Sequence, residues 1–314
     1  MRTGLPSAAR MADAQRLSVE VAQAWRKGAG FQRLVRAFSG LEDRPAECVA
    51  EQAASLFSSA DWLKELLAPL LAALGDDWWV QPPLRIGREG ARISAVLYES
   101  RVVAISASVL SADALASAPP VASVVVPGRM IVSCCHAGGG ARRALWDGGR
   151  IGENFTAAAA PACINIGEEL LVDGAVMRHD GRHLGQVIHS AQRDVVMVTA
   201  VIRADAAPFT REYATSSGAL VRLAPLDDCG SRAQMLMALL RHCGNEQAGR
   251  VFEQMSYDPA FFVRWSAMRE WLAMDARAAL PRLVVMAMGD PHEDVRRAAE
   301  IMVPRVKKRL SCLA

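Results

Sequence analysis

Histidine is the residue type in this sequence with the most direct bearing on chemistry, because its ring nitrogens bind metal ions and transfer protons. The chain contains His136, His179, His183, His189, His242 and His292. His183 and His189 would share one face of an extended strand, but at six residues apart they would be about 20 Å from each other. They therefore need ligands from elsewhere in the fold to hold one ion.

A metal centre requires an arrangement that brings one of these rings to a carboxylate. His136, His183 and His189 are the candidate metal ligands. Glu168 and Glu212 are the carboxylates that could meet them. If no histidine lies beside a carboxylate, the histidines are expected at turns and on the surface. In that case we predict no catalytic residue, no bound metal and no cofactor.

Motifs of the common enzyme classes are missing from the sequence. It has no G-x-S-x-G, no H-E-x-x-H and no G-x-G-x-x-G. Residues 138–140 are all glycine, but no Lys-Ser or Lys-Thr follows them, so they predict a turn rather than a phosphate-binding loop. The missing motifs favour a binding role over catalysis.

The cysteines indicate a reducing compartment. There are seven, an odd number, and none form a C-x-x-C pair. A disulfide framework or a structural zinc site is therefore not expected. The N-terminus lacks the pattern of a signal peptide, and the apolar runs are too short to span a membrane. We expect a soluble cytoplasmic protein.

Composition and charge are those of an ordinary globular protein. The 314 residues are 52% hydrophobic and 22% charged, which is enough for two or three domains with sizeable cores. Lysine and arginine number 36 and aspartate and glutamate 33, for a net charge of +3. This balance weighs against a dedicated nucleic-acid binder.

Residues 1–75 have apolar side chains at helical spacing. The clearest stripe follows Asp61 and consists of Leu63, Leu66, Leu67, Leu70, Leu71 and Leu74. Pro69 is expected to kink this helix and Gly75 to end it. We predict that this region forms a helical bundle.

Residues 76–228 change to a period near two, with β-branched side chains and frequent turn residues. The predicted strands are 91–98, 102–109, 122–126, 130–135, 142–146, 168–172, 175–179, 183–189, 195–202, 209–213 and 219–224. Asp180 and Gly181 form the strongest turn signal and predict a β-hairpin. Cys134 and Cys135 would point to opposite faces of one strand. Many short strands with tight turns predict a jelly roll or a barrel.

Helical periodicity returns in residues 229–314. The predicted helices are roughly 231–242, 246–255, 260–274, 276–288 and 292–310. Short links between them imply antiparallel neighbours.

An internal repeat lies within these helices. Asp258, Pro259, Val263, Arg264 and Ala267 recur 32 residues further on as Asp290, Pro291, Val295, Arg296 and Ala299. The aspartate can cap a helix and the proline suits its first turn. The valine and the alanine, four residues apart, would pack inward on one face.

This D-P-x-x-x-V-R-x-x-A pattern resembles the HEAT repeat. The resemblance implies a stack of helical pairs, in which Arg264 and Arg296 form a polar ladder with aspartates of neighbouring repeats. It also implies a concave surface that binds a protein or peptide partner. Arg264, Arg296 and Trp265 are the interaction candidates.

The length and strand number of residues 76–228 resemble a cupin-type jelly roll. Cupin metal motifs pair two histidines as H-x-H, with a following glutamate and a later histidine. No H-x-H occurs in this chain. The resemblance is therefore architectural, and the sequence departs from the metal-binding motif.

The sequence as a whole predicts an α+β protein with an N-terminal helical segment (1–75), a β-rich jelly-roll or barrel-like domain (76–228) and HEAT-like repeats (229–314). The expected function is non-catalytic binding of a protein or ligand. One alternative is a cupin-like metal-dependent oxygenase or peptide-modifying enzyme. The other is nucleic-acid binding through the basic C-terminal residues Arg305, Lys307, Lys308 and Arg309.

Overall fold

The computed structural model describes residues 7–152, 155–245 and 247–312. Contacts between residues divide the chain into two compact units. The first unit comprises Met1–Asp147 and Ile164–Ala206, and the second comprises Gly148–Cys163 and Ala207–Ala314. The predicted domain boundaries after residues 75 and 228 stay predictions.

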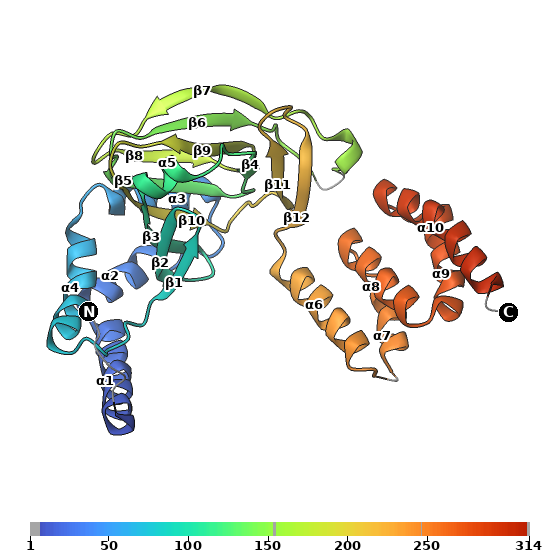
Figure 1. The fold of residues 1–314 in the computed structure, drawn as a ribbon, viewed down its shortest axis with the longest axis horizontal. Coiled ribbons are helices and arrows are strands. Elements are labelled where there is room, and N and C mark those ends of the chain that lie inside the picture. Colours follow the sequence, from blue (N-terminus) through green and yellow to red (C-terminus); the bar gives the residue numbers. More distant parts are fainter. Residues whose placement is uncertain (1–6, 153–154, 246, 313–314) are drawn as a thin grey trace. The chain divides into compact units, whose positions relative to one another are not determined.

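The first unit begins with helices (Figure 1), namely α1 (Ala8–Lys27), α2 (Ala29–Phe38), α3 (Ala46–Phe57) and α4 (Asp61–Asp76). Ser7 caps α1, because its hydroxyl accepts a hydrogen bond from the Arg10 backbone N–H at 3.2 Å. The leucine stripe forms α4 as predicted, with Leu66 and Leu70 buried and Pro69 inside the helix. α4 ends at Asp76, one residue after the predicted stop.

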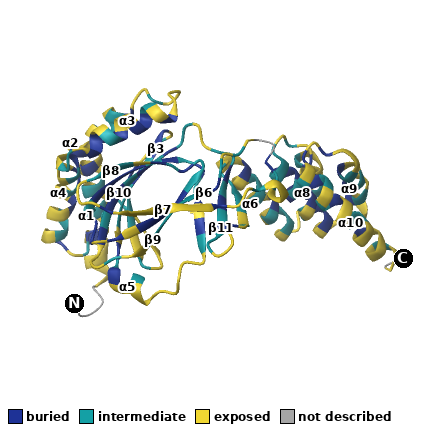
Figure 2. Ribbon diagram, turned by 90° about the horizontal axis from the view of Figure 1, so that it is seen from above, coloured by how far each residue is buried: buried dark blue, intermediate teal, exposed yellow. Residues whose placement is uncertain are grey.

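A six-stranded antiparallel sheet follows these helices. Its strands, in spatial order, are β1 (Arg85–Glu89), β2 (Arg92–Glu99), β3 (Val103–Leu110), β10 (Val195–Ile202), β5 (Met130–Ala137) and β8 (Val176–Asp180). A second antiparallel sheet has the order β7 (Ile164–Leu170), β6 (Arg142–Asp147) and β9 (Leu184–Ser190). β7 is exposed along its whole length (Figure 2).

Two short elements complete the first unit. β4 (Ser123–Val126) lies beside β9, and α5 (Ala112–Ser117) is a single short helix. Neither β1 nor α5 is among the predicted elements. The mixture of helices and antiparallel sheets confirms the predicted α+β class.

The hairpin predicted at Asp180 and Gly181 is wrong. β8 pairs with β5 in the large sheet, whereas β9 pairs with β6 in the small one, so the chain crosses between sheets at this turn. Gly181 is held against another segment, because its carbonyl accepts the Gly128 N–H at 2.7 Å. A Cβ on Gly181 would approach the Arg129 carbonyl oxygen to 2.4 Å. Tertiary packing therefore determines this turn.

One face of the six-stranded sheet shares an apolar core with the helices. Val103, Ile105, Val132, Val198 and Ala200 are buried there together with side chains of α1 to α4. Because side chains alternate along a strand, the residues between them face the other way, towards β6 and β9. The N-terminal helices and the large sheet therefore form one structural body.

The two adjacent cysteines lie on opposite faces of β5, as predicted. Cys134 belongs to the core shared with the helices, and Cys135 belongs to a smaller core with Leu110, Ala141 and Leu171. Burial raises the pKa of both thiols, which keeps them protonated and unreactive.

The second unit contains a hairpin and a series of helices. The hairpin is β11 (Phe209–Ala214) with β12 (Leu220–Pro225). The helices are η1 (Ala157–Ala159), α6 (Asp228–His242), α7 (Ala248–Met255), α8 (Phe261–Met274), α9 (Ala276–Gly289) and α10 (Glu293–Ser311). α6 to α10 confirm the five C-terminal helices predicted from the sequence. Glu246, where the second of them was expected to begin, lies outside the described residues.

The repeated residues occupy equivalent places in this unit. Val263 on α8 and Val295 on α10 are both buried, and so are Ala267 and Ala299 one turn later. All four belong to one core, which explains why the repeat keeps small or β-branched side chains at these positions. None of the helices in the described part of the chain has both the length and the apolar character that crossing a bilayer requires.

Candidate functional site

A cavity of about 300 Å³ lies between the two sheets of the first unit. The large sheet contributes Ser94, Ser106, Ser108, Ile131, Met197, Thr199 and Val201. The small sheet contributes Arg143, Gln186 and Ile188, and Leu171 follows β7. Glu89 and Arg92, both exposed, line the cavity at the β1–β2 turn. The volume is at the small end of the range for ligand pockets.

Hydroxyl groups cover the wall that the large sheet provides. Ser106 on β3 lies opposite Thr199 on β10, which in turn lies opposite Ser133 on β5. The Ser133 and Thr199 hydroxyl oxygens are 3.1 Å apart and form a hydrogen bond. Ser94 and Ser108 form the next cross-strand pair. This face of the sheet therefore carries hydroxyl groups among its apolar side chains, while the core-facing side is apolar.

Arg143 is the charged side chain buried in the opposite wall. The register of β6 with β7 places it directly across from Glu169. Its Nε and Nη2 donate to Glu169 Oε2 at 3.1 and 2.6 Å, and its Nη1 donates to Gln186 Oε1 at 2.8 Å. The Arg143 side chain is only 8% exposed, whereas that of Glu169 is 52% exposed. A guanidinium carries more N–H donors than these bonds use.

The pocket is therefore suited to binding a polar molecule. The fork of an arginine matches the two oxygens of a carboxylate, and hydroxyl groups both donate and accept hydrogen bonds. Ile131, Met197 and Val201 add apolar surface beside them. No histidine is among the described residues that line this pocket.

The structure places His183 beside two carboxylates outside the pocket. Its Nδ1 is 3.2 Å from Asp147 Oδ1, and its Nε2 is 3.7 Å from Asp180 Oδ2. The two ring nitrogens point to different partners, so these groups do not converge on one ion. The hydrogen bond that Asp147 accepts from Nδ1 instead orients the ring.

The other metal-ligand candidates are dispersed. His189 Nε2 lies 3.2 Å from Glu168 Oε1, and His136 is on β5. Glu212 is on β11, in the second unit. Within the part of the chain that the structure describes, no three His, Cys, Asp or Glu side chains gather to hold a metal. Among the candidate pairs, the structure brings His189 together with Glu168.

His179 is a buried histidine with a structural contact. Its Nε2 is 3.0 Å from the Leu184 carbonyl oxygen and donates to it in the neutral ring. Burial lowers the pKa of His179, so the ring stays uncharged in the folded protein. This contact joins the end of β8 to the start of β9.

The interaction candidates from the repeat lie in the second unit. Arg264 is buried, and its Nε and Nη2 donate to Asp290 at 3.0 and 2.7 Å. Arg296 donates from Nη1 to the Asp290 carbonyl oxygen at 2.6 Å. Trp265 is half-buried and packs against the core of this unit. Their role in partner binding stays a prediction.

The sequence does not mark the pocket residues as a site, because none of them belongs to a catalytic motif. The available signal was alternation, since Ser106 and Ser108 interleave with apolar residues along one strand. A second signal was Arg143, a charged residue inside a predicted strand. Its pairing with Glu169, 26 residues away, depends on strand register and has no local signature.

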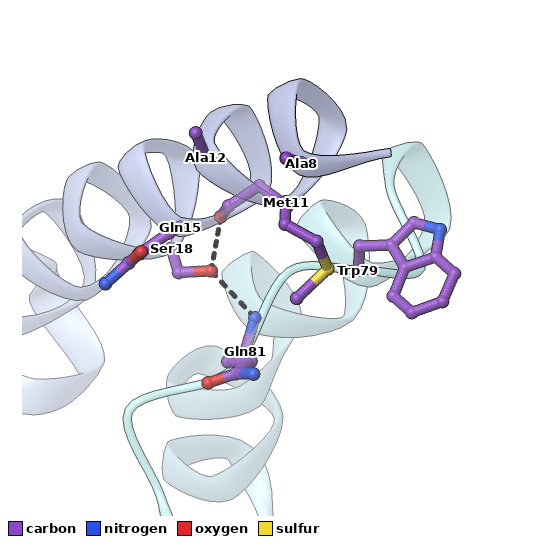
Figure 3. A pocket seen from close by; sticks show the side chains of 8 residues that line it. Ala8, Met11, Ala12, Gln15, Ser18, Trp79 and Gln81 are labelled. Carbon is purple, nitrogen blue, oxygen red and sulfur yellow. Dashed lines mark hydrogen bonds between the residues drawn. The ribbon is translucent and has the colours of Figure 1, made fainter. Parts of the chain in front are cut away.

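A second hollow, of about 500 Å³, lies along α1 in the first unit (Figure 3). Met11, Trp79 and Gln81 line it. Ser18 donates a hydrogen bond to the Ala14 carbonyl at 2.6 Å and accepts one from the Gln81 N–H at 2.9 Å. The described lining has no charged side chain, so this hollow offers less to a polar ligand than the cavity between the sheets.

Comparison with known proteins gives structural likenesses only, since no protein-family model and no curated sequence matches the chain. A cupin domain from Bordetella pertussis is similar at 14% identity and a TM-score of 0.23, over 38% of this chain and 99% of that one. A sugar phosphate isomerase of the cupin superfamily from Silicibacter pomeroyi is similar at 13% identity and a TM-score of 0.24, over 44% and 78% of the two chains.

Hydroxypropylphosphonic acid epoxidase from S. wedmorenis is similar at 11% identity and a TM-score of 0.25, over 59% of this chain and 97% of that one. At these TM-scores the likenesses carry no argument about activity. The chain itself is an α+β protein with two antiparallel sheets enclosing a polar pocket.

Proposed function

We propose that this protein is a non-catalytic binding protein. The pocket of the first unit holds a small polar molecule, and the helices of the second unit bind a protein or peptide partner. The observation that carries the ligand-binding role is the buried guanidinium of Arg143 in the pocket wall. Burying a charge costs free energy, and the core between the six-stranded sheet and the helices packs without one.

The remaining lining supports this role. Pockets for small molecules combine apolar surface with a few convergent polar groups that orient the ligand. Here Gln186, Ser106 and Thr199 are such groups, and Ile131 and Met197 supply apolar surface. Glu89 and Arg92 of the β1–β2 turn line the pocket and are exposed, so a ligand would enter on this side.

The lining also favours binding without catalysis. The cupin resemblance implies a metal held by histidines, yet the described histidines do not line this pocket. The described lining offers a guanidinium and no imidazole, so it does not fit such a metal. Metal analysis of the purified protein is the direct check, and a stoichiometric transition metal that resists dialysis would favour the oxygenase alternative.

We interpret α6 to α10 as HEAT-like helical pairs. Arg264 donates to the Asp258 carbonyl at 2.8 Å, and Arg296 makes the same bond to the Asp290 carbonyl at 2.6 Å. Arg264 also reaches Asp290 of the following copy, which is the ladder that the HEAT resemblance implies. These repeated contacts at the Asp-Pro turns support a stack of like units.

The outer face of α6 is the proposed partner surface. Met235, Leu236 and Leu239 lie on one face of this helix and are 53–64% exposed. Terminal helices of repeat stacks normally have polar outer faces. The exposed face of α10 is mostly polar, with Arg297, Arg305 and Lys308 beside a single large apolar residue, Ile301. The apolar face of α6 is therefore suited to an apolar surface of a partner.

We also place the protein in the cytoplasm. Cys229, Cys243 and Cys312 are exposed thiols. Exposed thiols persist where glutathione and thioredoxin keep them reduced. Fractionation of host cells with an antibody to the chain would check this placement, and recovery from a secreted or periplasmic fraction would contradict it.

The ligand-binding role can be tested by saturation-transfer NMR with a mixture of hydroxy acids, sugars and amino acids. Ser108→Leu would fill part of the pocket, and Val109→Leu changes the next residue, which is exposed on the other face of β3. We expect a bound component with the wild type and with Val109→Leu, and loss of that signal with Ser108→Leu. Binding that survives Ser108→Leu unchanged would place the ligand elsewhere.

The partner surface can be tested by pull-down from the native host. Leu236→Glu places a charge on the apolar face of α6, and Ile301→Glu places the same charge on the exposed side of α10. We expect the first variant to lose its partner and the second to retain it. Equal retention of the partner by both variants would show that the apolar face of α6 is not the partner surface.

A further inference from the structure

We infer that the pocket binds a small hydroxycarboxylic acid, and that the ligand's carboxylate takes the place of Glu169 on Arg143. This inference rests on the proposed ligand-binding function and names the class of ligand. It follows from the unequal burial of the two partners, from the charge balance of the exchange and from the groups that line the rest of the cavity.

The ion pair is anchored at one end only. Arg143 is held from β6, is almost fully buried and also bonds Gln186. Glu169 projects from β7, whose residues are all exposed, and half of its side chain already faces water. A rotation of the Glu169 side chain into solvent therefore costs little desolvation, whereas Arg143 has no comparable way out.

Replacing one carboxylate by another keeps the site neutral. Glu169 prevents Arg143 from being buried without a counter-charge when the pocket is empty. An incoming carboxylate supplies the same charge, and the guanidinium can bind its two oxygens side by side. A neutral ligand cannot release Glu169, because Arg143 would then lose its counter-charge. The pair thus selects for carboxylates.

The rest of the lining indicates what the carboxylate is attached to. Ser106 and Thr199 lie across the cavity from the small sheet and present hydroxyl groups. Hydroxyl groups on the ligand can exchange hydrogen bonds with them. The volume of about 300 Å³ limits the ligand to a small molecule. A short carbon chain with hydroxyl groups and one carboxylate matches these features.

The neighbouring ion pair provides a matched control. Arg142 and Glu168 are one residue earlier on the same two strands, and Arg142 Nε lies 3.4 Å from Glu168 Oε2. Both side chains are well exposed and neither lines the pocket. Changes in this pair alter the net charge in the same way without touching the site.

Trifluoroacetate and its neutral isostere trifluoroacetamide can probe the site by ¹⁹F NMR titration of the full chain. We expect E169Q to bind trifluoroacetate about tenfold more tightly than the wild type, because no internal carboxylate competes and one charge-assisted pair is gained. R143Q is expected to lose this binding, and R143K to retain a weaker form of it because it lacks the fork. R142Q and E168Q should match the wild type, and trifluoroacetamide should not discriminate among the variants.

Equal trifluoroacetate binding by E169Q and the wild type, or by R143Q and R142Q, would overturn the inference. Circular dichroism of each variant confirms that it is folded. If components of the NMR mixture still bind in a manner blocked by Ser108→Leu, the pocket function stands and only the carboxylate exchange is rejected. If Ser108→Leu also has no effect, both are rejected.

Discussion

Each unit of the molecule buries an arginine against a carboxylate, and the two pairs differ in one respect. Arg264 and Asp290 in the second unit are 7% and 1% exposed, so both ends of the pair are closed off from water. Arg143 in the first unit is buried to the same degree, but its partner Glu169 is half exposed. We call the Arg264–Asp290 pair closed and the Arg143–Glu169 pair open.

The remaining bonds of each guanidinium follow the same distinction. Arg264 Nη1, the guanidinium nitrogen that does not bond Asp290, donates to the backbone carbonyls of Asp258 and Pro259. Arg143 Nη1 donates to the Gln186 side chain at the wall of a cavity. A closed pair fixes a turn of the chain, whereas an open pair can exchange its carboxylate. This difference separates a structural arginine from a binding one.

The closed pair should give the largest effect. Arg264→Met leaves Asp290 buried without a counter-charge and removes two bonds to carbonyls. We expect a loss of roughly 3–5 kcal/mol in the free energy of unfolding, measured with urea. Arg16→Met, which breaks an exposed pair with Asp13, should cost about 1 kcal/mol or less. Similar losses for the two variants would contradict the closed character of Arg264.

The two faces of the large sheet offer the same comparison between structural and ligand-binding residues, here with uncharged side chains. Ile105 is fully buried against the helices, and the next residue, Ser106, lines the pocket. We expect Ile105→Ala to reduce the free energy of unfolding by about 2–5 kcal/mol and Ser106→Ala by less than about 1 kcal/mol. Urea titration of both variants provides the comparison. A larger cost at Ser106 would mean that the polar face is structural.

The open pair should matter little for stability. After Arg143→Gln, the Glu169 side chain can turn towards water, so no buried charge is left behind. We expect a loss of about 1 kcal/mol, far less than for Arg264→Met. Thermal unfolding of the two variants side by side would reveal the order. A greater loss at Arg143 would reverse the roles assigned to the two arginines.

His179 is a buried histidine that stays neutral in the folded protein. Its replacement should have the smallest effect on the free energy of unfolding, and that effect should depend on pH. Because burial lowers its pKa in the folded state, stability is fully present above the ordinary histidine pKa of about 6.5 and declines as the pH falls below it. His179→Gln removes this titration, so its free energy of unfolding should change less between pH 7 and pH 5. If the free energy of unfolding depended on pH equally in the variant and the wild type, the His179 ring would have the same pKa in the folded and unfolded states.

The sequence predicts what depends on local periodicity. The five C-terminal helices have boundaries within a few residues of the expected ones, and the valines of the repeat are buried as matched side chains. Cys134 and Cys135 face opposite sides because alternation along a strand needs no knowledge of the partner strand. These are consequences of side-chain spacing alone.

The sequence fails where strand pairing decides. Asp180 and Gly181 have the composition of a hairpin turn, yet their flanking strands belong to different sheets. His183 meets Asp147, which is 36 residues away, and Arg143 meets Glu169 through the register of β6 with β7. Such pairings depend on which strands become neighbours in a sheet, and the local sequence does not determine this.

The exchange of its carboxylate partner distinguishes Arg143 from Arg264, which keeps Asp290. The most direct measurement is a ¹H–¹⁵N spectrum of the arginine Nε–H groups in the full wild-type chain, titrated with acetate and then with acetamide, with the two signals assigned from R143Q and R264K. We expect acetate to shift the Arg143 signal, acetamide to leave it unchanged, and the Arg264 signal to stay in place throughout. An Arg143 signal that acetate leaves unmoved, or that moves together with that of Arg264, would contradict this exchange.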